Sequence, residues 1–511
     1  MDIMMKIKGR CRRFAGGMIG VVILLGWGAA LFLSGCAPVG PSYQAPRPEL
    51  PVAWSDSVAA PAPLTGSDLL LGHWWTLFND PQLDSLIQRA IAANRDMEIA
   101  EARVQQARAQ YRLTTANAAP TLGVSGAYAN SRKSENAGGS GGGETQDLFQ
   151  TGFDAGWELD IFGGARRGGE AADARLVAMG ENSNDVLVSL TAEVARNYLE
   201  LRGSQQRLVT ARANLAGQEK TLALARGRRE AGLGNELEVA QAETQLSLTR
   251  AQSPPLENSV GQSSYRLALL LGLSPQALLA ELAPPVGLPL MPADLPATLP
   301  SDLLRRRPDI RRAERLLAAA TADIGVATAE LFPRFSLTGL AGLQSLNLSD
   351  LLSTSSRFWT VGPTVRWAIF NGGRVQANID LNQARREEAQ AVYEKTVLTA
   401  LSEVETALLA LAREEETRRT FVEAVASGQR AVELASGRYR SGLAGVLDVL
   451  LGERALYQSQ DQLVQSEQRR GVALVALCKA LGGGWELPVT SSGAASAGAV
   501  TPQLMPAGDV K

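Results

Sequence analysis

The residue types that carry most enzyme chemistry are scarce in this 511-residue chain. It has one histidine, His73, and three cysteines, Cys11, Cys36 and Cys478. A zinc site needs several Cys or His ligands at close spacing, and a nucleophilic triad needs a histidine beside its Ser or Cys. These residues can build neither, they allow no disulfide framework, and no carboxylate constellation stands out. The sequence therefore predicts no catalytic residue, no metal site and no cofactor, and His73 is expected to be structural.

Cys36 has a different chemistry. A basic head precedes an apolar run from Met18 to Leu33, which ends in Leu33-Ser34-Gly35-Cys36. The run is shorter than the ~20 residues of a membrane-spanning helix, which is typical of a secretory signal. Its last four residues resemble a bacterial lipobox, whose cysteine is acylated and becomes the first residue of the mature chain. We therefore expect lipidation at Cys36. An uncleaved membrane anchor is the alternative, and by resemblance Ala37 favours sorting to the outer membrane.

The charge balance excludes nucleic acid as a partner. Cleavage would remove five of the 50 basic residues and one of the 52 acidic residues, which leaves a net charge of −6. A nucleic-acid-binding domain would instead be basic.

The chain repeats itself. At a constant offset of 210 residues, glycines, leucines and charged residues coincide, among them Gly227/Gly437, Arg228/Arg438, Gly232/Gly442, Leu233/Leu443, Leu237/Leu447 and Glu243/Glu453. Glycines that occupy matching positions in the two halves indicate a structural duplication. We expect a signal peptide (1–35), a lipidated extended segment (36–72), a first repeat (73–252), a Pro-rich linker with short helices (253–308), a second repeat (309–485) and a disordered tail (486–511).

Each repeat contains one very long helix. The segments 166–230 and 374–440 are rich in Ala, Leu, Glu and Arg and contain no proline. At 1.5 Å per residue, each predicts a helix about 100 Å long. Such lengths without internal caps favour a coiled coil. A curved helical wall and a soluble coiled-coil rod both fit this composition.

Two strands precede each long helix. In 149–160 and in 358–367, apolar or aromatic residues alternate with polar ones; 335–343 forms a third apolar row and 122–128 a weaker fourth. Alternation over about ten residues with aromatics near the ends is typical of transmembrane barrel strands, although a soluble sandwich would also alternate. The polar rows place Asp154, Glu158, Asp160 and Arg366 in the expected barrel lumen.

Four strands cannot close a barrel alone. An open sheet would expose two unpaired edges to lipid, so sister chains must seal it. Two chains would leave no pore, whereas three would give twelve strands and a lumen. The predicted fold class is a membrane α+β protein, a trimeric 12-stranded β-barrel continued by a long α-helical barrel.

Several motifs together resemble the outer membrane factor family, the TolC-like channels and in particular their lipidated OprM/NodT-type subgroup. They are the lipobox, Trp74-Trp75-x-x-Phe78, Asp80-Pro81-x-Leu83, Arg307-Pro308-Asp309-Ile310 and Phe370-Asn371-Gly372-Gly373. The resemblance implies a homotrimer in the outer membrane that extends into the periplasm. It also implies two partners, a periplasmic membrane-fusion adaptor and an inner-membrane pump of the resistance-nodulation-division (RND) type, with the channel serving as a passive exit duct for small molecules such as drugs.

The resemblance also implies roles for residues at the far ends of the helices. The residues expected to bind the adaptor form two tips, at the turns of the two helical hairpins. They are Ala231, Gly232 and Leu233 in the first repeat and Ser441, Gly442 and Leu443 in the second. Glu433 and Phe421 match positions of the family's gate, and Arg438 and Arg226 are candidate partners that would pair across helices with Glu230 or Glu433. An exit duct for type I protein secretion and a lipid-anchored periplasmic scaffold without a pore remain alternatives.

Overall fold

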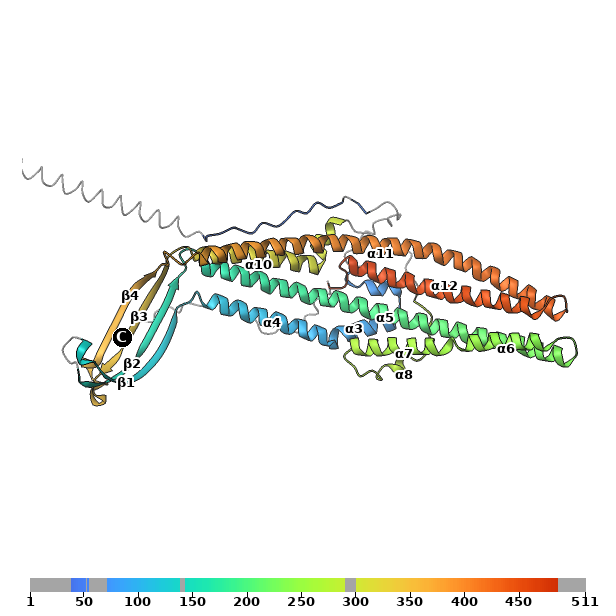
Figure 1. The fold of residues 1–511 in the computed structure, drawn as a ribbon, viewed down its shortest axis with the longest axis horizontal. Helices are drawn as coiled ribbons and strands as arrows, with labels where there is room; N and C mark the ends of the chain where they lie inside the picture. Colours follow the sequence, from blue (N-terminus) through green and yellow to red (C-terminus); the bar gives the residue numbers. More distant parts are fainter. Residues whose placement is uncertain (1–37, 52, 55–70, 138–142, 290–299, 486–511) are drawn as a thin grey trace, which may run out of the picture.

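The computed structural model describes residues 38–51, 53–54, 71–137, 143–289 and 300–485. Within these ranges the chain forms a long rod of helices with a small β-sheet at one end (Figure 1). The expected signal peptide, Cys36 and the C-terminal tail lie outside the described residues. No helix in the described ranges is both long enough and apolar enough to cross a membrane.

One order of elements occurs twice, as the sequence repeat predicts: a helix, two strands, a long helix, a turn and another helix. The first half contains α3 (Pro81–Ala93), α4 (Arg95–Ala116), β1 (Thr121–Arg132), β2 (Thr145–Leu159), α5 (Gly164–Glu230), α6 (Glu236–Arg250) and α7 (Ser253–Leu270). The second contains α10 (Pro308–Ala329), β3 (Arg334–Ser345), β4 (Arg357–Arg366), α11 (Arg374–Arg440) and α12 (Val446–Ala480). Short elements connect them, namely η1 (Trp74–Phe78), η2 (Glu135–Ala137), α8 (Leu279–Leu282), η3 (Pro300–Asp302), α9 (Leu303–Arg306), η4 (Leu348–Asp350) and η5 (Thr354–Ser356).

The two long helices have the expected positions and lengths. Helices α5 and α11 each contain 67 residues, which corresponds to about 100 Å. Each begins after a glycine in the left-handed region, Gly163 at φ 80° and Gly373 at φ 84°. A residue with a Cβ is disfavoured there, so these glycines turn the chain from sheet to helix.

The Pro-rich join between the halves differs from the expectation. The segment from 253 was expected to hold short helices at most, yet it begins with the 18-residue helix α7. Pro254 and Pro255 lie in the first turn of α7, where a missing N–H costs nothing and a fixed φ favours the helix. The linker therefore begins after Leu271 rather than at 253.

The sheet is antiparallel, with strand order β1-β2-β3-β4. Its register aligns Val124 with Phe153, Phe153 with Ala341, and Ala341 with Trp359. The apolar rows expected from the sequence therefore share one face. Strands β1 and β4 form the two edges, and neither edge is paired within the described chain.

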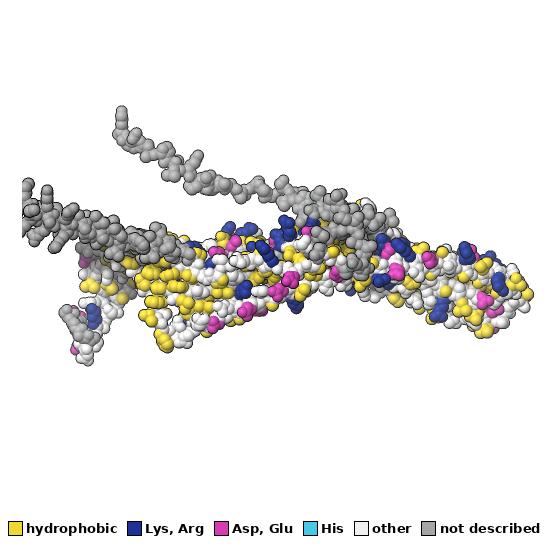
Figure 2. Space-filling model, turned by 90° about the horizontal axis from the view of Figure 1, so that it is seen from above, with side chains coloured by type: hydrophobic (Ala, Val, Ile, Leu, Met, Phe, Trp, Pro, Cys, Tyr) yellow, Lys and Arg dark blue, Asp and Glu magenta, His cyan; other side chains and the backbone are white. Residues whose placement is uncertain are grey.

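The main hydrophobic core lies in the middle of the rod, where α3, α5, α7, α10, α11 and α12 meet. Trp74 and Phe78 of η1 are at most 1% exposed within it. A smaller core lies near the far end, between the hairpins α5–α6 and α11–α12. Figure 2 shows hydrophobic side chains gathered toward the sheet end of the rod, whereas charged side chains are spread over its middle.

Candidate functional site

The two helical hairpins end in the same turn. In the first, the N–H of Gly232 donates to the carbonyl of Arg229, and the N–H of Leu233 donates to the carbonyl of Arg228. The same pair of bonds joins Gly442 to Tyr439 and Leu443 to Arg438. This is the Schellman arrangement, which needs a left-handed residue after the helix. Gly232 at φ 70° and Gly442 at φ 71° supply it.

Each turn places a leucine in solvent. Leu233 is 68% exposed and Leu443 is 71% exposed. Hydrophobic side chains at an otherwise polar helix end are candidates for contact with another protein. All six residues expected at the docking tips therefore lie at the far end of the rod from the sheet (Figure 1), and their docking role stays a prediction.

A network behind the turns ties the two hairpins together. Arg228 donates to the carbonyl of Tyr439 at 3.1 Å, and its guanidinium lies 4.9 Å from the centre of the Tyr439 ring. The Tyr439 hydroxyl donates to Glu238 of α6 at 3.1 Å. Burial, followed by the hydrogen bond to Glu238, raises the pKa of Tyr439 to about 12. The hydroxyl therefore remains a donor at neutral pH.

Neither Tyr439 nor Glu238 stands out in the sequence. Their contact joins residues 201 positions apart, and hydrophobic periodicity carries no information about such a pair. The one available signal is an aromatic residue in the last turn of a polar helix, two positions before Ser441.

The predicted gate residues are not brought together in the single chain. Arg226 forms an ion pair with Glu243 of α6 at 2.6 Å, and in the described single chain it forms no ion pair with Glu230 or Glu433. Glu433 and Arg438 are exposed and form no ion pair within the described residues, and Phe421 is half-buried. Their gate role stays a prediction.

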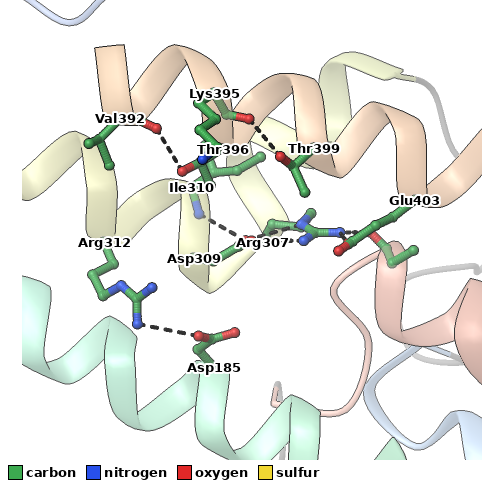
Figure 3. Close-up of polar contacts among 11 residues, drawn as sticks. Asp185, Arg307, Asp309, Ile310, Arg312, Val392, Lys395, Thr396, Thr399 and Glu403 are labelled. Carbon is green, nitrogen blue, oxygen red and sulfur yellow. Dashed lines mark hydrogen bonds and ion pairs between the residues drawn. The ribbon is translucent and has the colours of Figure 1, made fainter. Parts of the chain in front are cut away.

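The middle of the rod is held by a buried arginine. Arg307 is 7% exposed and binds three elements (Figure 3): Asp309 of α10 at 2.7 Å, Glu403 of α11 at 2.7 Å, and the carbonyl of Ala480 in α12 at 2.8 Å. Nearby, Arg312 reaches Asp185 of α5 at 3.4 Å. The motif Arg307-Pro308-Asp309 therefore fastens the start of α10 to both helices of the second hairpin.

The other sequence motif of this region is also structural. Asp80 caps α3 by accepting from the N–H groups of Gln82 and Leu83, and it accepts a 2.6 Å bond from the Tyr198 hydroxyl of α5. Capping satisfies donors that a helix start leaves free. Among the residues described, no group of three or more His, Cys, Asp or Glu could hold a metal ion.

On the sheet, three of the four expected lumen residues lie on the polar face. Asp154 and Glu158 of β2 and Arg366 of β4 alternate with the apolar row and share its opposite side. The expected place of Asp160 in the barrel lumen is wrong, because this residue lies beyond the end of β2. Its carboxylate accepts from the N–H groups of Ala165 and Arg166 at 3.0 and 2.9 Å, and so it caps α5, whose N-terminal dipole attracts negative charge.

The segment that follows Cys36 in sequence is bound along the rod. The N–H of Val39 donates to the carbonyl of Phe162 at the junction of sheet and helices. Arg167 donates to the carbonyl of Val39 at 3.2 Å, and the Tyr43 hydroxyl donates to Glu314 at 2.8 Å. These contacts place residue 39, three positions after Cys36, at the base of the sheet.

Comparisons with known proteins agree over most of the chain. The family described as "Outer membrane efflux protein" matches residues 86–273 and 299–483. Outer membrane protein OprJ of Pseudomonas aeruginosa is 35% identical, over 89% of this chain and 95% of its own length. Antibiotic efflux pump outer membrane protein ArpC of Pseudomonas putida is 34% identical, over 89% and 94%. The solved structure of the outer-membrane channel OprN is 36% identical, with a TM-score of 0.83 over 88% of this chain and 99% of that one.

Proposed function

Because the chain belongs to the outer membrane efflux protein family and is thus an outer-membrane efflux channel, we propose that it works as a trimer. Three copies close their sheets into a twelve-stranded barrel, and their hairpins continue it as a helical tunnel into the periplasm. The sheet with two unpaired edges is the observation that supports this assembly. In hydrocarbon each unpaired backbone group would cost several kcal/mol, and closure removes both edges.

The transport step needs no chemistry in the channel. The polar face with Asp154, Glu158 and Arg366 lines a wet path through the barrel, and the apolar face meets lipid. The exposed tips with Leu233 and Leu443 dock a periplasmic adaptor, which connects the channel to an inner-membrane RND pump. The name of the relative ArpC supports small molecules such as drugs as the cargo.

The lipid on Cys36 adds a second attachment to the same membrane. Val39 is held at the base of the sheet, so acyl chains on Cys36 enter the inner leaflet beside the barrel. Several acyl chains suffice for stable anchoring.

Conductance in planar lipid bilayers tests the proposal. The full-length lipidated protein, purified in mild detergent, is expected to run as a trimer and to produce discrete ion-conducting steps. A folded monomer without conductance would instead identify a lipid-anchored scaffold. Loss of drug resistance in cells that lack the protein, restored by the wild-type gene, tests the cargo separately.

A further inference from the structure

Three polar residues of α5 lie seven positions apart and face α12. Arg207 binds Asp461 at 2.6 Å, Asn214 donates to Gln460 at 2.9 Å, and the Thr221 hydroxyl donates to Glu453 at 2.6 Å. A spacing of seven keeps residues on one face of a helix that packs on another. These contacts form a polar seam between the first and second hairpins, which we call the α5–α12 seam.

Glu453 is the unusual member of the seam. Its Oε1 atom accepts from Thr221, while its Oε2 atom is buried and has no hydrogen-bond partner in the described chain. Within the described ranges no cation lies at ion-pair distance. Several charged groups on the flanking elements are exposed, namely Glu219 and Lys220 of α5, Glu243 of α6, Arg430 and Glu433 of α11, and Arg454 of α12 itself. Arg228, seven positions after Thr221 on α5, is half-buried and donates to the carbonyls of Tyr439 and Leu233. Tyr457, one turn further along α12, is half-buried as well. A buried carboxylate without a cation is costly in its ionised form.

Gln218 presents a deficit of the same kind. It is 3% exposed, and its Oε1 atom is an acceptor without a donor. In sequence it lies between Asn214 and Thr221, at helical spacings of four and three that place it on the same face of α5. The seam thus contains two buried oxygen acceptors that have no hydrogen-bond partner in the described chain. A proton on Glu453 removes the unpaired charge from this buried position.

The internal repeat explains how this arrangement arises. Glu243 is the counterpart of Glu453 at the 210-residue offset, and it pairs with Arg226 across its own hairpin. The counterpart of Arg226 is Ser436, so the second hairpin has no arginine at that place. Glu453 turns to Thr221 of the first hairpin instead.

We propose that Glu453 is a proton-binding site of the α5–α12 seam, neutral when the two hairpins are packed, and that its ionisation loosens them. Burial raises the pKa of Glu453, and the hydrogen bond from Thr221 lowers it by a smaller amount. A raised pKa in the packed state means that packing is favoured at low pH and loses this contribution as the pH rises through that value. The consequence for conduction depends on the channel function proposed above.

Glu453→Gln tests the site because it keeps the shape of the side chain and can never ionise. Conductance of the full-length wild-type channel, recorded between about pH 5 and 9, is expected to increase with pH. The Glu453→Gln channel is expected to lose this increase and to stay at the low-pH level. Glu243→Gln is the matched control, since its parent carboxylate is exposed and paired, and it should retain the wild-type pH dependence.

Infrared spectroscopy gives a readout that needs no conduction. The native protein at neutral pH is expected to show the C=O stretch of a protonated carboxylic acid, which Glu453→Gln removes and Glu243→Gln leaves. If that band is the same in all three proteins, the proton site is overturned. If the band behaves as expected but no protein conducts, the proposed channel function fails while the proton site stands.

Discussion

Cys478 and Cys36 are the two cysteines of the expected mature chain, and their chemistry is opposite. Cys478 is fully buried in the central core, and burial raises the pKa of its thiol to about 12. A protonated, inaccessible thiol does not react with maleimide. We expect no labelling of the native channel at about pH 8. After denaturation in detergent we expect one labelled thiol per chain, because lipid blocks Cys36.

The count of thiols therefore reports on lipidation. Two labelled thiols per denatured mature chain would mean that Cys36 carries no lipid. Cys478→Ala provides the control, since it should reduce the count to zero while leaving the lipidated chain in place.

Arg307 shows how much a single residue stabilises the middle of the rod. Replacement by Ala removes the buried donor of the Ala480 carbonyl and the ion-pair partner of Asp309, which keeps only the N–H of Ile310. Removal of one partner from a buried pair costs about 3–5 kcal/mol. We expect Arg307→Ala to lower the midpoint of unfolding in denaturant clearly and to reduce the amount of channel in the membrane.

A surface arginine serves as its control. Arg89 and Glu281 form an ion pair in which both side chains are 39% exposed. Exposed pairs contribute about 0–1 kcal/mol, so Arg89→Ala should barely shift the midpoint. Equal effects of the two substitutions would contradict the central role of Arg307.

At the scale of elements, substitutions at the hairpin tips can distinguish the docking of an adaptor from the conduction of ions. Leu233→Asp and Leu443→Asp place charge at the exposed turns without touching a core. We expect the double variant to lose binding to adaptor-containing membranes in a pull-down assay and to keep the wild-type conductance. Leu248 of α6 is 56% exposed but lies away from the turn, so Leu248→Asp should keep both.

The tie between the hairpins makes a second prediction for these elements. Tyr439→Phe removes the hydroxyl that donates to Glu238 and keeps the ring beside Arg228. A hydrogen bond to a charged group contributes about 1.5–3 kcal/mol. We expect the variant to open more often in bilayers than the wild type. Glu238→Gln should act in the same direction, and an unchanged open fraction in both variants would show that this contact does not hold the channel closed.

Elements with a strong local signal were predictable from the sequence, and contacts between distant segments were not. Helix α11 begins and ends where its composition predicts, at Arg374 and Arg440, because no proline interrupts it. The expected start of the Pro-rich linker at 253 is too early, because the effect of a proline depends on its position and Pro254 lies in the first turn of α7. Asp160 has the same alternation as a strand residue, and only the fold reveals that it caps α5.

At the scale of the whole molecule, one chain combines two kinds of surface along its length. The sheet carries an apolar face with large exposed side chains, whereas the helices carry mixed charges over a central core. In the proposed barrel, lipid surrounds only the sheet, so the rod stands upright from the membrane. Its helices of about 100 Å carry the tips deep into the periplasm, where the proposed adaptor binds.

The environment of Trp359 tests this orientation. Trp359 lies on the apolar face of β4 and is 76% exposed in the single chain. In the proposed barrel that face meets acyl chains. We expect brominated lipids to quench its fluorescence and aqueous acrylamide to quench it weakly. The Trp359→Phe channel should lose part of the lipid-dependent quenching, while Trp485→Phe, in the helical part, should not. Strong acrylamide quenching of Trp359 together with no effect of brominated lipid would place the sheet in water, and the barrel could not form.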